Sequence, residues 1–251
     1  MDSPHEAYCA AAEAEAAKIL DLVRTADPTT PVPTCPGWTV ASLVKHHGTT
    51  HRWMEYLIRN RVTERIWSRD IPRHLPDDVA AYPAWLAESA AGSLRAMREA
   101  DPDMPMWTIG ADQHARFWPR RLLHETTVHR ADLEIALGRT PVVDAAHAVD
   151  GIDELLELIP CFKLLREGVR ALGDGRTLHL HATDADGEWL ITTGGESFTW
   201  QRGHAKGDVA VRGPAGDLLL LAYGRLSPEH KPFEVYGDRD LLVDWIAATA
   251  L

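Results

Sequence analysis

The sequence is poor in cysteine and contains no long apolar run. Cys9, Cys35 and Cys161 are an odd number of widely spaced cysteines, and none belongs to a CxxC pair. They therefore predict free thiols in a reducing compartment rather than a disulfide framework. The absence of about 18 consecutive apolar residues predicts that no helix spans a membrane. The charged N-terminal segment lacks the apolar core of a signal peptide, so we expect a cytoplasmic protein.

The chain also lacks a block of basic residues. Its 251 residues include 26 Lys and Arg against 37 Asp and Glu, which gives a net charge of −11. This balance argues against binding to nucleic acid or to an anionic membrane. Hydrophobic residues make up 45% of the chain and charged residues 25%, as is typical of a globular protein with a large core. We expect a monomer or a weak homodimer whose partners are small molecules.

Common catalytic motifs are missing from the sequence. It contains no Gly-x-Ser-x-Gly elbow, P-loop or Rossmann glycine pattern.

The first half of the chain has the pattern of a helical domain. Helical spacing of apolar residues predicts five helices, at about 5–26, 39–59, 77–100, 118–138 and 144–159. Their lengths are typical of an antiparallel four-helix bundle.

The pattern changes to alternation near Gly173. The segments TLHLHAT, EWLITT, ESFTWQ and DVAVRG predict strands, and Asp186-Gly187 predicts a hairpin turn between the first two. A helix, a short strand (FEVYG) and a C-terminal helix follow. The sequence therefore predicts an α+β protein, with a helical domain at 1–165 and a smaller α+β domain with an antiparallel sheet at 166–251.

Two polar residues occupy the core-facing side of the helix predicted at 118–138. At about 100° per residue, His129 lies inside the apolar stripe and Glu125 at its edge, one turn earlier. His124 points to the opposite side. An unpaired charge or imidazole costs several kcal/mol to bury, so these two residues require a compensating partner.

A metal ion is one such partner. Glu125 and His129 are four residues apart and share a helix face, and a third ligand from another helix would complete an open, catalytic-type site. The helix at 39–59 offers His46, His47 and His51, and periodicity does not choose among them. The alternative is that Glu125 pairs with an arginine and that His129 is a satisfied core histidine.

Other residues with reactive or binding potential each have a plainer alternative. Cys35 is either a nucleophile or a small buried residue in a turn. Trp38, Trp53 and Trp118 either wall a pocket or pack in the core. Arg225 either binds a carboxylate or is a solvated cation at a helix end.

Two segments carry a resemblance to a known family. TCPGWTVASLVKHHGTTHRW resembles the opening signature of the mycothiol-dependent maleylpyruvate isomerase family, part of the DinB-like bundle superfamily, and WPRRLLHETTVHRADLEIALG resembles that family's fourth-helix signature. The segment from TLHLHAT onward resembles the family's sterol-carrier-protein-like second domain. The resemblance thus covers nearly the whole chain.

The resemblance implies a set of site residues. It implies that His46, Glu125 and His129 bind a divalent metal, usually zinc, with Ni²⁺, Fe²⁺ or Mn²⁺ also compatible with these donors. The family normally has an apolar residue after its first ligand, where this chain has His47. Arg225 matches a family arginine that binds the thiol or the substrate.

The resemblance also implies a reaction. The metal lowers the pKa of mycothiol, a low-molecular-weight thiol of actinobacteria, and the thiolate attacks a small electrophilic substrate. The expected enzyme is a maleylpyruvate-isomerase-like cis/trans isomerase or a thiol S-transferase. One alternative is a thiol-independent metalloenzyme of specialised metabolism that uses the metal as a Lewis acid. The other is a non-enzymatic carrier of a small apolar ligand with a structural metal.

Overall fold

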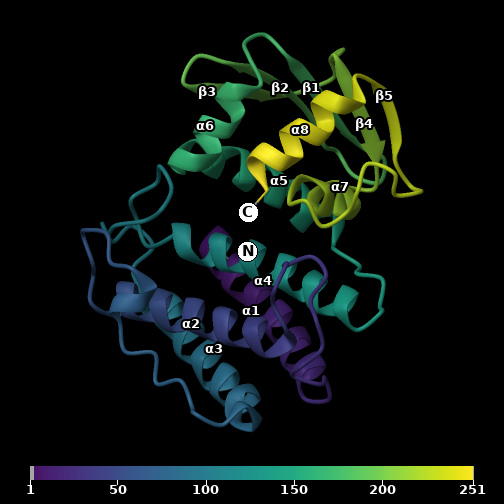
Figure 1. Cartoon of the computed structure of the whole chain (residues 1–251). Helices are drawn as coiled ribbons and strands as arrows, with labels where there is room; N and C mark the ends of the chain where they lie inside the picture. The colour runs from purple at the N-terminus through teal and green to yellow at the C-terminus, as the bar shows by residue number, and fades with distance from the viewer. Residues whose placement is uncertain (1–2, 251) are drawn as a thin grey trace. The chain divides into compact units, whose positions relative to one another are not determined.

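A computed structural model describes residues 3–250, and contacts divide the chain into two compact units between Pro141 and Val142. Figure 1 labels helices α1 to α4 in the first unit, and helices α5 to α8 with the sheet in the second. This division is earlier than the predicted boundary after residue 165. The reason is that α5 (Ala145–Leu158) packs against α7 (Ala215–Ala222), so the fifth helix belongs to the second unit.

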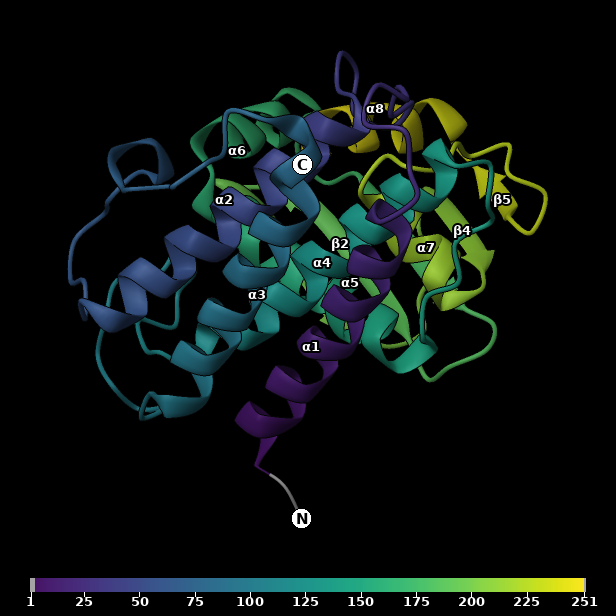
Figure 2. The same cartoon turned by 90° about the horizontal axis from the view of Figure 1, so that it is seen from below.

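The first unit is a bundle of four long helices. These are α1 (Pro4–Val23), α2 (Val40–Arg59), α3 (Tyr82–Glu99) and α4 (Phe117–Ala136), with short 3-10 helices η1 (Ser68–Asp70) and η2 (Val79–Ala81) between α2 and α3. The most extensive contacts join α2 to α3 and α1 to α4, and Figure 2 shows α2 and α3 side by side. The predicted four-helix bundle is confirmed.

Three helix ends carry residues that favour the start or the end of a helix. The Thr39 hydroxyl accepts a hydrogen bond from the Ser42 N–H at 3.4 Å and caps α2. Gly138 has φ +70° just after α4, a conformation that glycine adopts without strain. Pro83 lies in the first turn of α3, where its missing N–H costs no helical hydrogen bond.

Tryptophans form part of the bundle core. Trp118 is fully buried in a cluster with Leu122 and Met54, and its ring lies 5.4 Å from the Trp53 ring in an edge-to-face arrangement. Such pairs contribute about 0.5–1.5 kcal/mol beyond their buried area. Trp53 and Trp118 therefore pack in the core, which is the plainer of the two alternatives, and Trp38 is described with the candidate site.

The second unit contains a five-stranded mixed sheet in the order β3-β2-β1-β4-β5. The strands are β1 (Thr177–Ala182), β2 (Glu188–Gly194), β3 (Ser197–Arg202), β4 (Val209–Gly213) and β5 (Glu234–Gly237). The expectation of a fully antiparallel sheet is wrong, because β1 and β4 pair in parallel. The connection at 203–208 carries the chain from the outer strand β3 back across two strands, so β4 starts at the same end of the sheet as β1.

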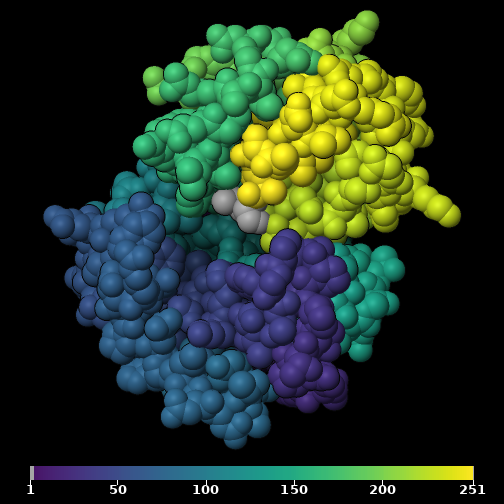
Figure 3. All heavy atoms as spheres, in the orientation of Figure 1, coloured from purple at the N-terminus to yellow at the C-terminus, as the bar shows by residue number. Residues whose placement is uncertain are grey.

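Helices cover the apolar side of this sheet. Leu178 and Leu180 of β1 are buried and alternate with His179 and His181. The covering elements include α6 (Lys163–Ala171), α7 and α8 (Arg239–Thr249), with η3 (Ile159–Cys161) before α6. The sequence pattern did not predict α6, which is short. In Figure 3, the yellow α8 forms part of the surface of this unit.

Two exclusions drawn from the sequence agree with the structure. Residues 3–250 contain no helix that is both long and apolar enough to cross a bilayer. The three cysteines all lie in this range and form no disulfide. Cys9 is buried, Cys35 is partly buried and Cys161 is exposed.

Candidate functional site

Three side chains from two helices of the bundle meet at one carboxylate oxygen. His46 Nε2 on α2 lies 3.0 Å from Glu125 Oε1 on α4, and His129 Nε2 lies 3.3 Å from the same oxygen. One donor atom from each residue lies within 4.8 Å of the other two. The structure therefore brings together the three residues that the resemblance implied.

The two oxygens of Glu125 have different partners. Arg121, one turn earlier on α4, contacts Oε2 at 2.5 Å, while Oε1 faces the two histidines. The arginine pairing proposed as the plainer alternative is thus present. It engages one oxygen and orients the other toward His46 and His129, so both interpretations describe part of the same arrangement.

His129 is oriented by a buried aspartate that the sequence pattern did not single out. Asp132 is fully buried, and its Oδ2 lies 2.9 Å from His129 Nδ1. The Cys35 thiol donates to the same oxygen at 3.5 Å. A carboxylate on Nδ1 fixes the tautomer and directs Nε2 outward, as in metal-bound histidines. The spacing along the sequence could have indicated this contact, because Asp132 follows His129 by three residues and so lies on the same helix face.

Electrostatics favour a negative carboxylate beside a positive imidazole. Burial alone would raise the pKa of Glu125, but Arg121 and hydrogen bonds from the histidines hold that pKa well below its ordinary value. Burial would lower the pKa of His129, but Asp132 and Glu125 hold it well above its ordinary value. Metal uptake at these atoms would therefore be coupled to proton release.

A proline- and glycine-rich turn forms one wall of the site. The Trp38 N–H donates to the Cys35 carbonyl at 3.0 Å, with Pro36 and Gly37 between them. Gly37 has φ +82°, as the third residue of a type II turn requires, and proline suits the second position. The turn places the Trp38 ring 5.0 Å from the His46 ring. Trp38 thus borders the site, and Cys35 occupies a turn, as its plainer interpretation held.

The other two histidines of α2 belong to the core. His47 and His51 are buried, and their Nε2 atoms lie 3.2 Å apart. His51 Nδ1 lies 2.7 Å from the Ser93 hydroxyl on α3. Desolvation lowers the pKa of His47 well below its ordinary value and that of His51 to about 4, so both are neutral at pH 7. The structure therefore distinguishes His46 from its neighbours.

The donor set fits a divalent metal. Two imidazole nitrogens and one carboxylate oxygen are the three-ligand set of open zinc sites, and the same donors accept nickel, iron or manganese. In a tetrahedral zinc site the ligand atoms lie about 3.3 Å apart. The observed separations of 3.0 and 3.3 Å around Glu125 Oε1 are close to this value.

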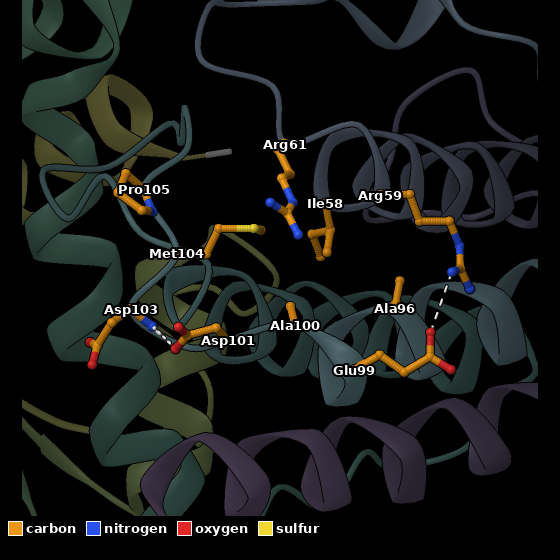
Figure 4. Close-up of a pocket in the computed structure, with 10 residues that line it drawn as sticks. All are labelled: Ile58, Arg59, Arg61, Ala96, Glu99, Ala100, Asp101, Asp103, Met104 and Pro105. Atoms are coloured by element: carbon orange, nitrogen blue, oxygen red, sulfur yellow. Dashed lines mark hydrogen bonds and ion pairs between the residues drawn. The ribbon is translucent and has the colours of Figure 1, made fainter.

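A cavity of about 510 Å³ elsewhere in the bundle has a different lining. It is bordered by Ile58, Arg59 and Glu99, with Arg59 paired to Glu99 (Figure 4). Ile58 follows His46 by about 18 Å along α2, at 1.5 Å per residue. The residues that line this cavity are charged or apolar and include none of the three candidate ligands, so the cavity is separate from the candidate metal centre.

Arg225 belongs to the second unit, just after α7. Its guanidinium donates to the Tyr223 carbonyl at 2.6 Å, and its backbone N–H donates to the Leu220 carbonyl at 2.7 Å. The structure thus anchors Arg225 at a helix end. A role in binding thiol or substrate stays a prediction.

The fold and the site define a class of protein: a helical bundle with a candidate His-Glu-His metal centre, followed by an α+β unit. Residues 9–134 match the mycothiol maleylpyruvate isomerase N-terminal domain, and residues 146–243 match the C-terminal domain of the same family. The chain belongs to the mycothiol-dependent maleylpyruvate isomerase family.

Solved structures agree with this assignment at the level of the fold. The chain is similar to the crystal structure of the mycothiol-dependent maleylpyruvate isomerase, with a TM-score of 0.66, 17% identity and 93% of each chain covered. The structure of a histidine-to-alanine mutant of that enzyme gives the same values. No curated protein sequence is significantly similar to the chain.

Proposed function

We propose that this protein is a metal-dependent enzyme that uses mycothiol, or a similar low-molecular-weight thiol, as a nucleophile toward a small electrophilic substrate. The observation that supports this most directly is the convergence of His46 Nε2 and His129 Nε2 on Glu125 Oε1. Membership of the mycothiol-dependent family is the reason for proposing mycothiol as the thiol. The reaction is a cis/trans isomerisation or an S-transfer.

The surrounding residues prepare these three ligands. Arg121 holds Glu125 Oε2 and leaves Oε1 as a single donor atom. Asp132 accepts from His129 Nδ1 and so presents the lone pair of Nε2. A divalent metal at these atoms would lower the pKa of a thiol, so that the thiolate is available near neutral pH. The Trp38 ring lies 5.0 Å from the His46 ring and borders one side of it.

The thiolate and the substrate determine which of the two reactions occurs. In an isomerisation, the thiolate would add to a conjugated double bond, the resulting single bond would rotate, and the thiolate would leave. In an S-transfer, the carbon–sulfur bond would remain. Arg225 is the proposed cation for a carboxylate of the substrate or the thiol, because guanidinium matches carboxylate geometry.

Metal content of purified variants tests the metal centre. His46→Ala, Glu125→Gln and His129→Ala should each lose one equivalent of metal per chain. The zinc content is measured by elemental mass spectrometry after the protein has been loaded with zinc and desalted. His147→Ala is the control, because His147 is a partly exposed histidine on α5. Arg225→Gln should keep the metal and raise KM. Wild-type metal content in all three ligand variants would contradict the proposed centre.

Thiol binding is tested separately. Calorimetric titration of the zinc-loaded protein with mycothiol should show binding that His46→Ala abolishes. If the metal is present but thiol neither binds nor changes turnover, the thiol mechanism is wrong and the Lewis-acid alternative is favoured.

A further inference from the structure

A second cluster of histidines surrounds a carboxylate in the α+β unit. His179 and His181 are two residues apart on β1 and therefore share one face of the sheet. Glu188 on β2 lies directly opposite His181 in the antiparallel register. His204, in the connection at 203–208, lies over the same side chains, with its ring 5.5 Å from the His179 ring.

The distances around Glu188 resemble those of a metal-ligand set. Glu188 Oε2 lies 3.3 Å from His179 Nε2 and 2.9 Å from His204 Nδ1. Donor atoms of these three residues all lie within 4.8 Å of one another. Ligand atoms of a tetrahedral zinc site are about 3.3 Å apart. His181 Nδ1 lies 2.9 Å from the other oxygen, Oε1, and so orients the carboxylate.

A buried nitrogen atom points into this cluster without a hydrogen bond. His179 is only 4% exposed, and its Nε2 has no hydrogen-bond partner among residues 3–250. A buried polar atom of this kind destabilises the fold unless something binds it. Its nearest ion-pair partner, Glu188 Oε2, is shared with His204. A cation between these atoms would satisfy all three at once.

Solvent can reach the cluster from one side. The His204 side chain is 81% exposed, whereas that of His179 is 5% exposed. The cluster therefore combines a buried ligand on the sheet with an exposed ligand on a connection, which provides a path for an ion. Because imidazole and carboxylate are borderline-to-hard donors, zinc, nickel and cobalt are the matching metals.

We propose that His179, Glu188 and His204 form a second divalent transition-metal site, in which His181 positions the carboxylate. A metal at this site would join β1, β2 and the connection at 203–208. The site lies within the second unit and is independent of the proposed thiol chemistry.

Zinc stoichiometry of the full chain tests this inference. Calorimetric titration of metal-free protein with Zn²⁺ should show two equivalents per chain. His204→Ala should show one, and because this side chain is exposed, the substitution leaves the core intact. Glu188→Gln should also show one, and His46→Ala combined with His204→Ala should show none. His230→Ala, which removes a histidine facing Asp217 at 3.4 Å, is the matched control and should keep two.

The two sites fail in different ways. A single equivalent that His46→Ala abolishes and His204→Ala retains would overturn the second site and leave the first intact. A single equivalent with the opposite pattern would overturn the proposed metal centre of the bundle and support the second site. Binding of no zinc at all would overturn both.

Discussion

At the scale of single residues, the surroundings of each histidine determine what it can do. His129 has a carboxylate on each ring nitrogen, from Asp132 and Glu125, and its pKa is raised. His51 lies in the core beside a hydroxyl and another imidazole, and its pKa falls to about 4. The same side chain is therefore charged in one place and neutral in the other.

The buried His51 predicts a loss of stability in mild acid. Because desolvation lowers its pKa from 6.5 to about 4, the unfolded chain takes up a proton between these values while the folded chain does not. The free energy of unfolding should then fall by roughly 3 kcal/mol as pH drops through this window. Urea unfolding at a series of pH values measures this change in the free energy of unfolding.

The matching variant for this prediction is His51→Gln, which has no titrating group. Its unfolding free energy should change less with pH between 6.5 and 4 than that of the wild-type protein. Equal slopes for His51→Gln and the wild type would show that His51 is not the cause.

At the scale of elements, α2 and α3 approach closely at one glycine. A Cβ atom at Gly48 would lie 2.2 Å from the Trp85 ring, which is too close for any contact. Trp85 is itself held by a hydrogen bond from its Nε1 to the Arg73 carbonyl at 3.0 Å. Gly48 also lies two residues after His46, so this contact helps to set the position of the ligand-bearing helix.

Gly48→Ala should therefore destabilise the bundle. Overpacking costs about 1–3 kcal/mol, which exceeds the gain of about 1 kcal/mol from replacing a helical glycine. Gly92→Ala on α3 is the matched control, because its new Cβ would meet only the end of the flexible Glu55 side chain. Urea midpoints of both variants give the comparison, and a Gly48→Ala variant as stable as Gly92→Ala would refute the packing argument.

At the scale of the whole molecule, a metal bound at His46, Glu125 and His129 should stabilise the bundle more directly than the second unit. Binding to the folded state adds about 2.7 kcal/mol when the free metal is 100 times its dissociation constant. In a His204→Ala background, chelation should therefore accelerate hydrogen exchange in α2 and α4. Mass spectrometry of the exchanged protein measures this.

The sheet of the second unit is the internal reference for that experiment. Exchange in β1 and β2 should be unchanged by chelation when His204 is absent, because the second proposed site is then lost. If α2 and α4 exchange at the same rate with and without chelator, the bundle holds no stabilising metal.

Local sequence patterns determined most of the helices and strands, and the side of α4 that carries Glu125 and His129. Helical spacing placed Glu125 and His129 on one side of α4, since a helix repeats every 3.6 residues. Capping residues such as Thr39 marked a helix start, and alternation marked the strands. These features depend on neighbouring residues along the chain, so periodicity suffices to predict them.

Only the tertiary structure decided which distant residues meet. Periodicity left His46, His47 and His51 open, and the packing of α2 against α4 brings His46 to Glu125. The parallel pairing of β1 with β4 and the gathering of His204 over Glu188 depend on the path of the connection at 203–208. Contacts of this kind depend on how elements pack and cross, and no local period of the sequence encodes them.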